Sequence, residues 1–183
     1  MAKGVKILGI VGSLRKNSYN KALMHLAFEV LPKGVTLQVF DIKDIPPFNQ
    51  DDEQNIPEVV EDLKSKIRSS DAVLIACPEY NYSIPGVLKN ALDWASRPYG
   101  DNALERKPVA VMSASIGRLG GARAQYHLRQ IFVALNMYPV NRPEVMMPFA
   151  AQKVDAKGKI IDEESRELVK QLLIALIDWT KRI

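Results

Sequence analysis

GSLRKNSYN, residues 12–20, is the stretch that decides how this sequence is interpreted. It follows an apolar run at 5–11 and precedes a segment with helical spacing of its apolar residues. A strand, a hydroxyl-rich turn and a helix start place unpaired backbone N–H groups and the positive end of a helix dipole at one point. The side chains that can add donors or charge there are Ser13, Arg15, Ser18 and Asn20. The stretch therefore predicts a site for a phosphate monoester.

Short β-branched runs alternate with longer helical segments along the rest of the chain, which is typical of parallel strands joined by crossover helices. The predicted strands are Val5–Val11, Thr36–Asp41, Ala72–Cys77, Val109–Ser113 and Tyr138–Asn141. The predicted helices are Tyr19–Leu31, Glu58–Ser69, Gly86–Ser96, Gly121–Leu135 and Glu163–Lys181, the last with Asp162 as its N-cap. This pattern predicts a three-layer α/β sandwich, formed as a single domain over residues 1–183.

Three loops of this fold follow predicted strands and should meet at one edge of the sheet, where α/β proteins bind their ligands. They are residues 12–18, 78–85 and 114–121. In the second loop, Pro78 and Pro85 hold the backbone amides between them in a set orientation. In the third, glycines permit close approach of a flat ring, and Ser115 can donate a hydrogen bond.

Plainer interpretations of these loops stay open. Ser18 or Asn17 can simply cap a helix, Arg15 and Arg118 can be solvated, and the second loop can be a surface turn. The first loop lacks the G-x-G-x-x-G spacing, which favours a mononucleotide over a dinucleotide held by its pyrophosphate. A cysteine-dependent phosphatase is strongly disfavoured, because Cys77 is the only cysteine and no arginine follows it in its loop.

Composition narrows the class of protein further. The chain has 183 residues, 47% of them hydrophobic, and a net charge of +4 that is spread without a basic run. That charge favours anionic small molecules and argues against nucleic acid as a partner. No apolar segment has the length of a membrane span, and we expect a cytoplasmic protein that contacts no membrane. Two isolated histidines predict no metal site.

Four blocks together resemble the NADPH-dependent FMN reductases of the flavodoxin-like superfamily, in particular the chromate, quinone or azo reductase branch. They are residues 12–20, PEYNYSIPGVLKNALDW at 78–94, SASIGRLGGARAQYHLRQ at 113–130 and the Pro143-Glu144 step. The resemblance implies a five-stranded parallel sheet of order 2-1-3-4-5, with helices on both faces and FMN at the carboxyl edge. The residues it places at the cofactor are Ser13, Arg15, Ser18, Tyr19, Asn20, Pro78, Glu79, Tyr80, Asn81, Tyr82, Ser83, Ser115 and Gly117.

The same resemblance implies the activity. NADPH or NADH gives a hydride to flavin N5, and the electrons pass to quinones, azo compounds, free flavins, ferric chelates or chromate; no side chain acts as the catalyst, since the flavin carries the chemistry. It also implies a homodimer packed on the 86–97 helix, or a tetramer with a second contact through Arg123, Tyr126 and Glu144. A flavodoxin-like electron carrier and a flavin-based redox sensor remain as alternatives.

The segment from Asp44 to Pro57 is long for a connection in such a fold. It contains apolar residues that can be buried, Ile45, Phe48 and Ile56, so a disordered linker is disfavoured. The sequence leaves two interpretations: a lid over the ring, or part of a subunit contact.

Overall fold

A computed structural model describes residues 4–183 and shows one parallel sheet of six strands. The order is β2-β1-β3-β4, with β5 and β6 both paired to β4. The bounds are β1 Lys6–Val11, β2 Thr36–Phe40, β3 Ala72–Ala76, β4 Pro108–Ala114, β5 Tyr138–Pro139 and β6 Val145–Met147. The predicted order 2-1-3-4-5 is confirmed.

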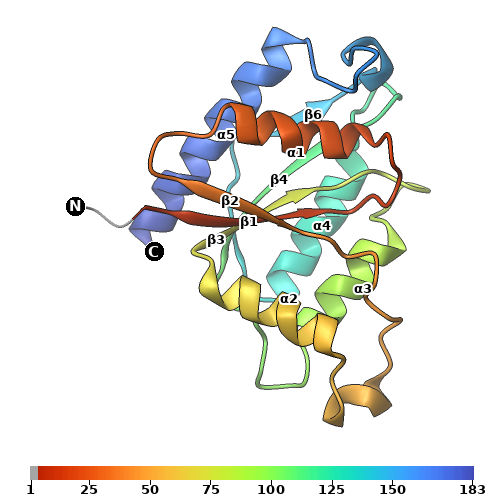
Figure 1. Cartoon of the computed structure of the whole chain (residues 1–183), viewed down its shortest axis with the longest axis vertical. Helices are drawn as coiled ribbons and strands as arrows, with labels where there is room; N and C mark the ends of the chain where they lie inside the picture. The colour runs from red at the N-terminus through yellow and green to blue at the C-terminus, as the bar shows by residue number, and fades with distance from the viewer. Residues whose placement is uncertain (1–3) are drawn as a thin grey trace.

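Helices cover both faces of this sheet (Figure 1). They are α1 Tyr19–Glu29, α2 Glu58–Ser69, α3 Gly86–Ala95, α4 Ala122–Ala134 and α5 Glu163–Arg182, with short 3-10 turns at Gln50–Gln54 and Ala150–Gln152. One apolar cluster joins α1 and α5 to the sheet, and a second joins α2, α3 and α4 to the other face. Among the helices described, none is long and apolar enough to cross a membrane.

The central strands are buried on both faces, which explains their nearly continuous apolar sequence. All five residues of β3 and all seven of β4 are buried. β3 lies between β1 and β4, with Gly9 paired to Leu74 and Leu74 to Ala110. This arrangement brings the carboxyl ends of β1, β3 and β4 to the same edge of the sheet.

The far edge of the sheet differs from the prediction of a single fifth strand over Tyr138–Asn141. β5 pairs with the start of β4 and β6 with its end, so two short strands share one edge position. Prolines at 139 and 143 have no N–H to donate, and proline in a sheet is confined to edges and strand ends. The three-residue β6 was missed because it is too short to show a strand period.

The long connection after β2 is fastened to α3. The Asn90 side chain accepts a hydrogen bond from the Phe48 N–H (2.7 Å) and donates to the Pro46 carbonyl (2.8 Å). Trp94 donates to the same carbonyl, and its ring meets Phe48 edge-on. The apolar residues of α3, Leu88, Leu92 and Trp94, are therefore buried within the chain, and the apolar character of this helix does not by itself indicate a subunit contact.

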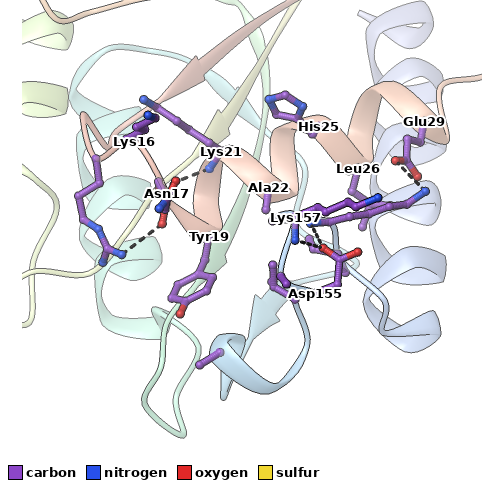
Figure 2. Close-up of a pocket in the computed structure, with 18 residues that line it drawn as sticks. Lys16, Asn17, Tyr19, Lys21, Ala22, His25, Leu26, Glu29, Asp155 and Lys157 are labelled. Carbon is purple, nitrogen blue, oxygen red and sulfur yellow. Dashed lines mark hydrogen bonds and ion pairs between the residues drawn. The ribbon is translucent and has the colours of Figure 1, made fainter.

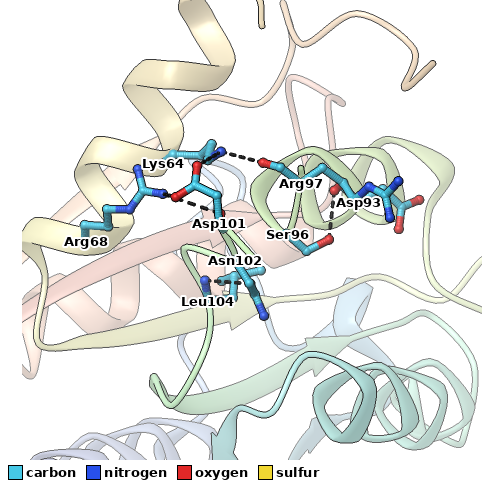
Figure 3. A network of polar contacts seen from close by, with 8 residues as sticks. All are labelled: Lys64, Arg68, Asp93, Ser96, Arg97, Asp101, Asn102 and Leu104. Atoms are coloured by element: carbon cyan, nitrogen blue, oxygen red, sulfur yellow. Dashed lines mark hydrogen bonds and ion pairs between the residues drawn. The ribbon is translucent and has the colours of Figure 1, made fainter. Parts of the chain in front are cut away.

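A buried lysine joins α2 to the loop after α3 (Figure 3). Lys64 is 0% exposed, and its ammonium group donates to the Arg97 carbonyl and to Asp101. Arg68 also binds this carboxylate. The hydrogen bond from Lys64 holds the pKa of the Asp101 carboxyl below its ordinary value of 3.8, against the opposing effect of burial and with further help from Arg68. The network fixes the loop on the face of the sheet that carries α2 and α3.

Candidate cofactor site

Three loops lie together at the carboxyl edge of the sheet, as the sequence predicts. The Asn20 side chain joins the first to the third: its amide nitrogen donates to the Ala114 carbonyl (3.0 Å), and its oxygen accepts from the Ala114 N–H (3.1 Å). The Cys77 N–H donates to the Met112 carbonyl (2.9 Å), which sets the start of the second loop beside β4. Asn20 is thus a buried connection between loops, with both amide atoms engaged by the protein.

The first loop is rich in free donors. Within residues 4–183, no acceptor meets the backbone N–H groups of residues 13–19. Ser18 is the N-cap of α1 and accepts hydrogen bonds from the N–H groups of Asn20 and Lys21, so the capping interpretation is correct; its own O–H remains free to donate. Arg15 is exposed and bonds only the Asn17 carbonyl (3.2 Å). A run of unpaired amides with one arginine fits an anionic group.

The second loop makes a tight hairpin. Tyr80 and Ser83 exchange two backbone hydrogen bonds, of 3.0 and 2.9 Å. The two residues between them have positive φ, 49° at Asn81 and 65° at Tyr82, which is the geometry of a type I′ turn. A tyrosine in this conformation is strained, and such strain concentrates at functional sites. The turn leaves the Tyr82 side chain 65% exposed at the edge of the sheet.

Glu79 holds this hairpin against α4. Its carboxylate accepts hydrogen bonds from the Arg123 N–H (3.0 Å) and the Ala124 N–H (3.4 Å), and it pairs with the Arg123 guanidinium (3.1 Å). Gly121, the residue at the N-cap of α4, has no side chain to do this. Arg123 in turn lies over the Tyr82 ring, 3.9 Å from its centroid. The Glu79 side chain is therefore a helix cap supplied from a distant loop, which leaves its backbone N–H for a ligand.

The third loop depends on two glycines. Gly120 and Gly121 have φ of 59° and 93°, and a Cβ on either would lie 2.7 Å from neighbouring atoms. Ser115 accepts a hydrogen bond from the Gly117 N–H (3.1 Å) and keeps its O–H free. The Gly117 carbonyl accepts from the N–H of Phe149 (3.3 Å), which brings a fourth segment to the site.

Several exposed apolar side chains surround these loops, and sequence reasoning did not single out two of them, Ile116 and Phe149. Ile116 is 69% exposed and Phe149 is 47% exposed. Phe149 follows β6, which was not predicted, so no signal in the sequence placed it here. Tyr80 and Tyr82 are also exposed, on the second loop, and we call these four side chains the apolar rim of the site.

One histidine and the cysteine lie close to these loops, the first in contact with a loop hydroxyl and the second buried. His127 lies 3.0 Å from the Ser83 hydroxyl through Nδ1, a contact that joins α4 to the end of the hairpin. Cys77 is buried, and burial raises the pKa of its thiol to about 12, so it is not a nucleophile. The residues described contain no cluster of three or more metal-ligating side chains.

The hydrogen-bond donors of the first and second loops fit FMN. A terminal phosphate needs several N–H donors and a cation, which residues 13–19 and Arg15 offer. The edge of an isoalloxazine ring presents carbonyls, N5 and N3–H, and the N–H groups of Glu79, Asn81 and Tyr82 have no acceptor within the described chain. The structure places the three predicted loops at one edge of the sheet, and within them Asn20 and the Glu79 carboxylate have structural partners.

Known proteins are similar to this chain in sequence and in fold. A family model described as NADPH-dependent FMN reductase matches residues 5–152. An NAD(P)H-dependent FMN reductase of Pseudomonas aeruginosa is 48% identical over 100% of this chain and 99% of its own. An NADPH:quinone oxidoreductase of Arabidopsis thaliana is 41% identical, with 98% and 93% covered. The solved structure of the Paracoccus denitrificans flavoenzyme FerB, an NAD(P)H:(acceptor) oxidoreductase, superposes with a TM-score of 0.89 at 36% identity, with 97% and 98% covered.

These matches extend over the whole described fold, including the three loops and the sheet edge that they form. The resemblance predicted from the four sequence blocks is therefore confirmed. The chain belongs to the NADPH-dependent FMN reductase family.

Proposed function

We propose that this protein is an FMN-dependent NAD(P)H oxidoreductase that reduces quinones and related small acceptors. One observation carries the proposal: seven consecutive unpaired backbone amides, at residues 13–19, lie at the same sheet edge as the strained Tyr80–Ser83 hairpin. The first feature fits the phosphate of FMN and the second fits the edge of its ring. The relatives named as FMN and quinone reductases support the reaction.

The residues that would hold FMN divide by the part of the cofactor they meet. Arg15 and the hydroxyls of Ser13, Ser18 and Tyr19 belong to the phosphate end. The loop from Pro78 to Ser83 and the Ser115 hydroxyl belong to the ring, with Gly117 allowing close approach. Asn20 contributes by fixing the first loop to Ala114 rather than by touching the cofactor.

When bound, FMN supplies a two-electron centre between the nicotinamide and the acceptor. The chain's part is to orient and to stabilise charge. The amides of Glu79, Asn81 and Tyr82 are held by the hairpin and by the Glu79 cap, so they do not need to reorganise as negative charge develops near them. The rim of Tyr80, Tyr82, Ile116 and Phe149 provides flat apolar contact for an aromatic substrate.

This rim also accounts for broad acceptor use. Its four side chains are uncharged and exposed, and the Arg123 guanidinium over the Tyr82 ring is already paired with Glu79. We propose that quinones are the preferred acceptors, and that azo compounds, free flavins, ferric chelates and chromate react as further acceptors at the same open site. Flat aromatic acceptors gain the stacking contacts that chromate lacks.

We further propose a homodimer or tetramer. An open groove of about 540 Å³ lies between the start of α3 and α4, beside the Ser83–His127 contact. Arg123 and Tyr126 lie on the same α4 surface, and a second subunit seated there would border the Tyr82 ring. A cytoplasmic location stays a prediction from the sequence.

Steady-state oxidation of NADPH in the presence of a quinone tests the proposed function. We expect turnover that requires FMN and follows ping-pong kinetics, because the two substrates use one open site in turn. An FMN-binding protein that does not oxidise NADPH under these conditions would instead be a carrier or a sensor. A protein that binds no FMN would refute the site assignment as well.

A further inference from the structure

A long groove runs beside the first loop, on the side of α1 that faces residues 151–160 (Figure 2). Its volume is about 620 Å³. Small or apolar side chains form its walls: Tyr19, Ala22 and Leu26 from α1, and Ala151, Val154 and Ile160 from the opposite segment. The cofactor assignments above use Arg15, Ser18 and Tyr19 at one end of this groove and leave the rest of its lining without a ligand.

Each of the two acidic side chains of the groove has partners within the protein, cations in one case and backbone N–H groups in the other. Glu29 pairs with Lys159 (3.3 Å) and Arg166 (2.8 Å) at one end. The Asp155 carboxylate accepts hydrogen bonds from the N–H groups of Lys157 and Lys159, both at 2.9 Å, and so shapes the turn that forms the outer wall.

Three basic groups of the groove are available. Lys16, Lys21 and Lys157 line it, and none of the three has a carboxylate within 4.0 Å of its ammonium group in residues 4–183, whereas Lys159 is paired with Glu29 and Arg15 is assigned to FMN. Figure 2 shows Lys16 and Lys21 near the N-terminal end of α1 and Lys157 on the opposite wall, beside Asp155. The groove therefore offers cations at two separate places along a slot whose walls are partly apolar, which fits a ligand with two anionic groups and a flat ring between or beside them.

The groove is continuous with the cofactor site. Ser18 and Tyr19 belong both to the first loop and to the groove lining. On the other side, the Ala150 N–H donates to the Ser115 carbonyl (3.0 Å), which sets Ala151 of the groove beside the third loop. A ligand whose reactive ring lies against the third loop can thus extend directly into the groove.

We propose that this groove binds the adenosine half of NADPH, with the purine between the apolar walls and the diphosphate and 2′-phosphate at the two groups of cations. The proposal rests on the proposed function, since it places the remainder of that nicotinamide substrate. It adds a preference: a 2′-phosphate brings an extra charge of about −1.5 to −2, so the groove favours NADPH over NADH. Lys157 is the residue that discriminates.

Titration calorimetry on the FMN-loaded protein tests the groove without turnover, with adenosine 2′,5′-bisphosphate as the probe. We expect Lys157→Glu to weaken binding about 5- to 10-fold, the effect of losing a partly exposed charged contact and adding a repulsion. Ala151→Trp, which fills the slot at an exposed position, should weaken it as well. Lys181→Glu, at the far end of α5, makes the same change in net charge and should leave binding unchanged.

Kinetics supply the second readout. In Lys157→Glu we expect the KM for NADPH to rise about 5- to 10-fold by the same contact loss, with kcat and the KM for NADH within about twofold of the wild type. Arg118→Glu is the competing variant, because Arg118 is an exposed cation on the third loop, outside the groove lining. A selective rise of the NADPH KM in Arg118→Glu, with none in Lys157→Glu, would overturn the groove assignment.

The binding measurement separates this proposal from the function it rests on. Unchanged bisphosphate binding in Lys157→Glu and Ala151→Trp refutes the groove even if the enzyme oxidises NADPH normally. Equal loss of affinity for inorganic phosphate and for the bisphosphate would show an unspecific cationic surface and also contradict the proposal. Weakened bisphosphate binding in a protein that cannot oxidise NADPH would support the groove while refuting the oxidoreductase.

Discussion

Removal of the Glu79 carboxylate should destabilise the junction of the hairpin and α4. In Glu79→Ala, two N–H groups at the start of α4 lose their acceptor, and Arg123 loses its partner. Loss of a helix cap costs about 1 kcal/mol. Loss of a negative charge at a helix N-terminus adds about 0.5 kcal/mol, and the half-exposed ion pair adds about 0.5 kcal/mol. We expect the free energy of unfolding to fall by about 2 kcal/mol.

Urea denaturation of the flavin-free protein measures this change, since bound FMN would add stability of its own. The melting temperature should fall by about 4–8 °C for a chain of this size. Glu79→Gln keeps an acceptor oxygen but loses the charge, so it should cost about half as much. Combined with Arg123→Ala, Glu79→Ala should show a coupling of about 0.5 kcal/mol.

Two results would refute this reasoning. If Glu79→Ala lowered stability by less than about 0.5 kcal/mol, the carboxylate would not be the cap of α4. If Glu79→Gln cost as much as Glu79→Ala, the charge and not the hydrogen bonds to the backbone would account for the whole effect.

Three further predictions concern other parts of the chain. Arg15→Ala should weaken FMN binding by about 1.5 kcal/mol or more, as measured by quenching of FMN fluorescence, and unchanged affinity would contradict the phosphate assignment. Asp101→Asn should cost about 2 kcal/mol because it leaves the buried Lys64 ammonium without a carboxylate, whereas Lys64→Met should cost less than about 1 kcal/mol; the reverse ranking in denaturation would show that the buried ammonium does not need its half-exposed partner. Burial raises the pKa of the Asp162 carboxyl, but hydrogen bonds from Ser165 and Lys153 outweigh it and hold the pKa below 3.8. The stability that wild type has over Asp162→Asn should therefore be full above about pH 4 and shrink as the pH falls further; a difference that stayed constant down to pH 2 would argue against this linkage.

Local patterns in the sequence predicted most elements of the fold. α2 begins and ends where its spacing predicts, at Glu58 and Ser69, and Asp162 caps α5 as expected. Proline and glycine mark the loop boundaries at residues 78–86 and 117–121. Each of these features is caused by residues within a few positions of it in the chain, so it can be predicted from the sequence alone.

The contacts that make the site depend on residues far apart in the chain. Asn20 bonds Ala114 and Glu79 caps α4 across 94 and 44 positions, and neither pairing leaves a local pattern. β6 could not be predicted because it is stabilised by pairing with β4 and not by its own three residues. Phe149 was missed with it. Sequence reasoning therefore found the three loops that meet at the sheet edge, but not which of their side chains serve the protein's own structure.

Anaerobic addition of NADPH to the FMN-loaded protein, followed by its visible spectrum, tests the central claim most directly. We predict a yellow protein whose flavin absorption disappears within the mixing time or shortly after, and returns when a quinone is added. Flavin absorption that persists with NADPH present would contradict the claim that this chain is an NAD(P)H-dependent oxidoreductase.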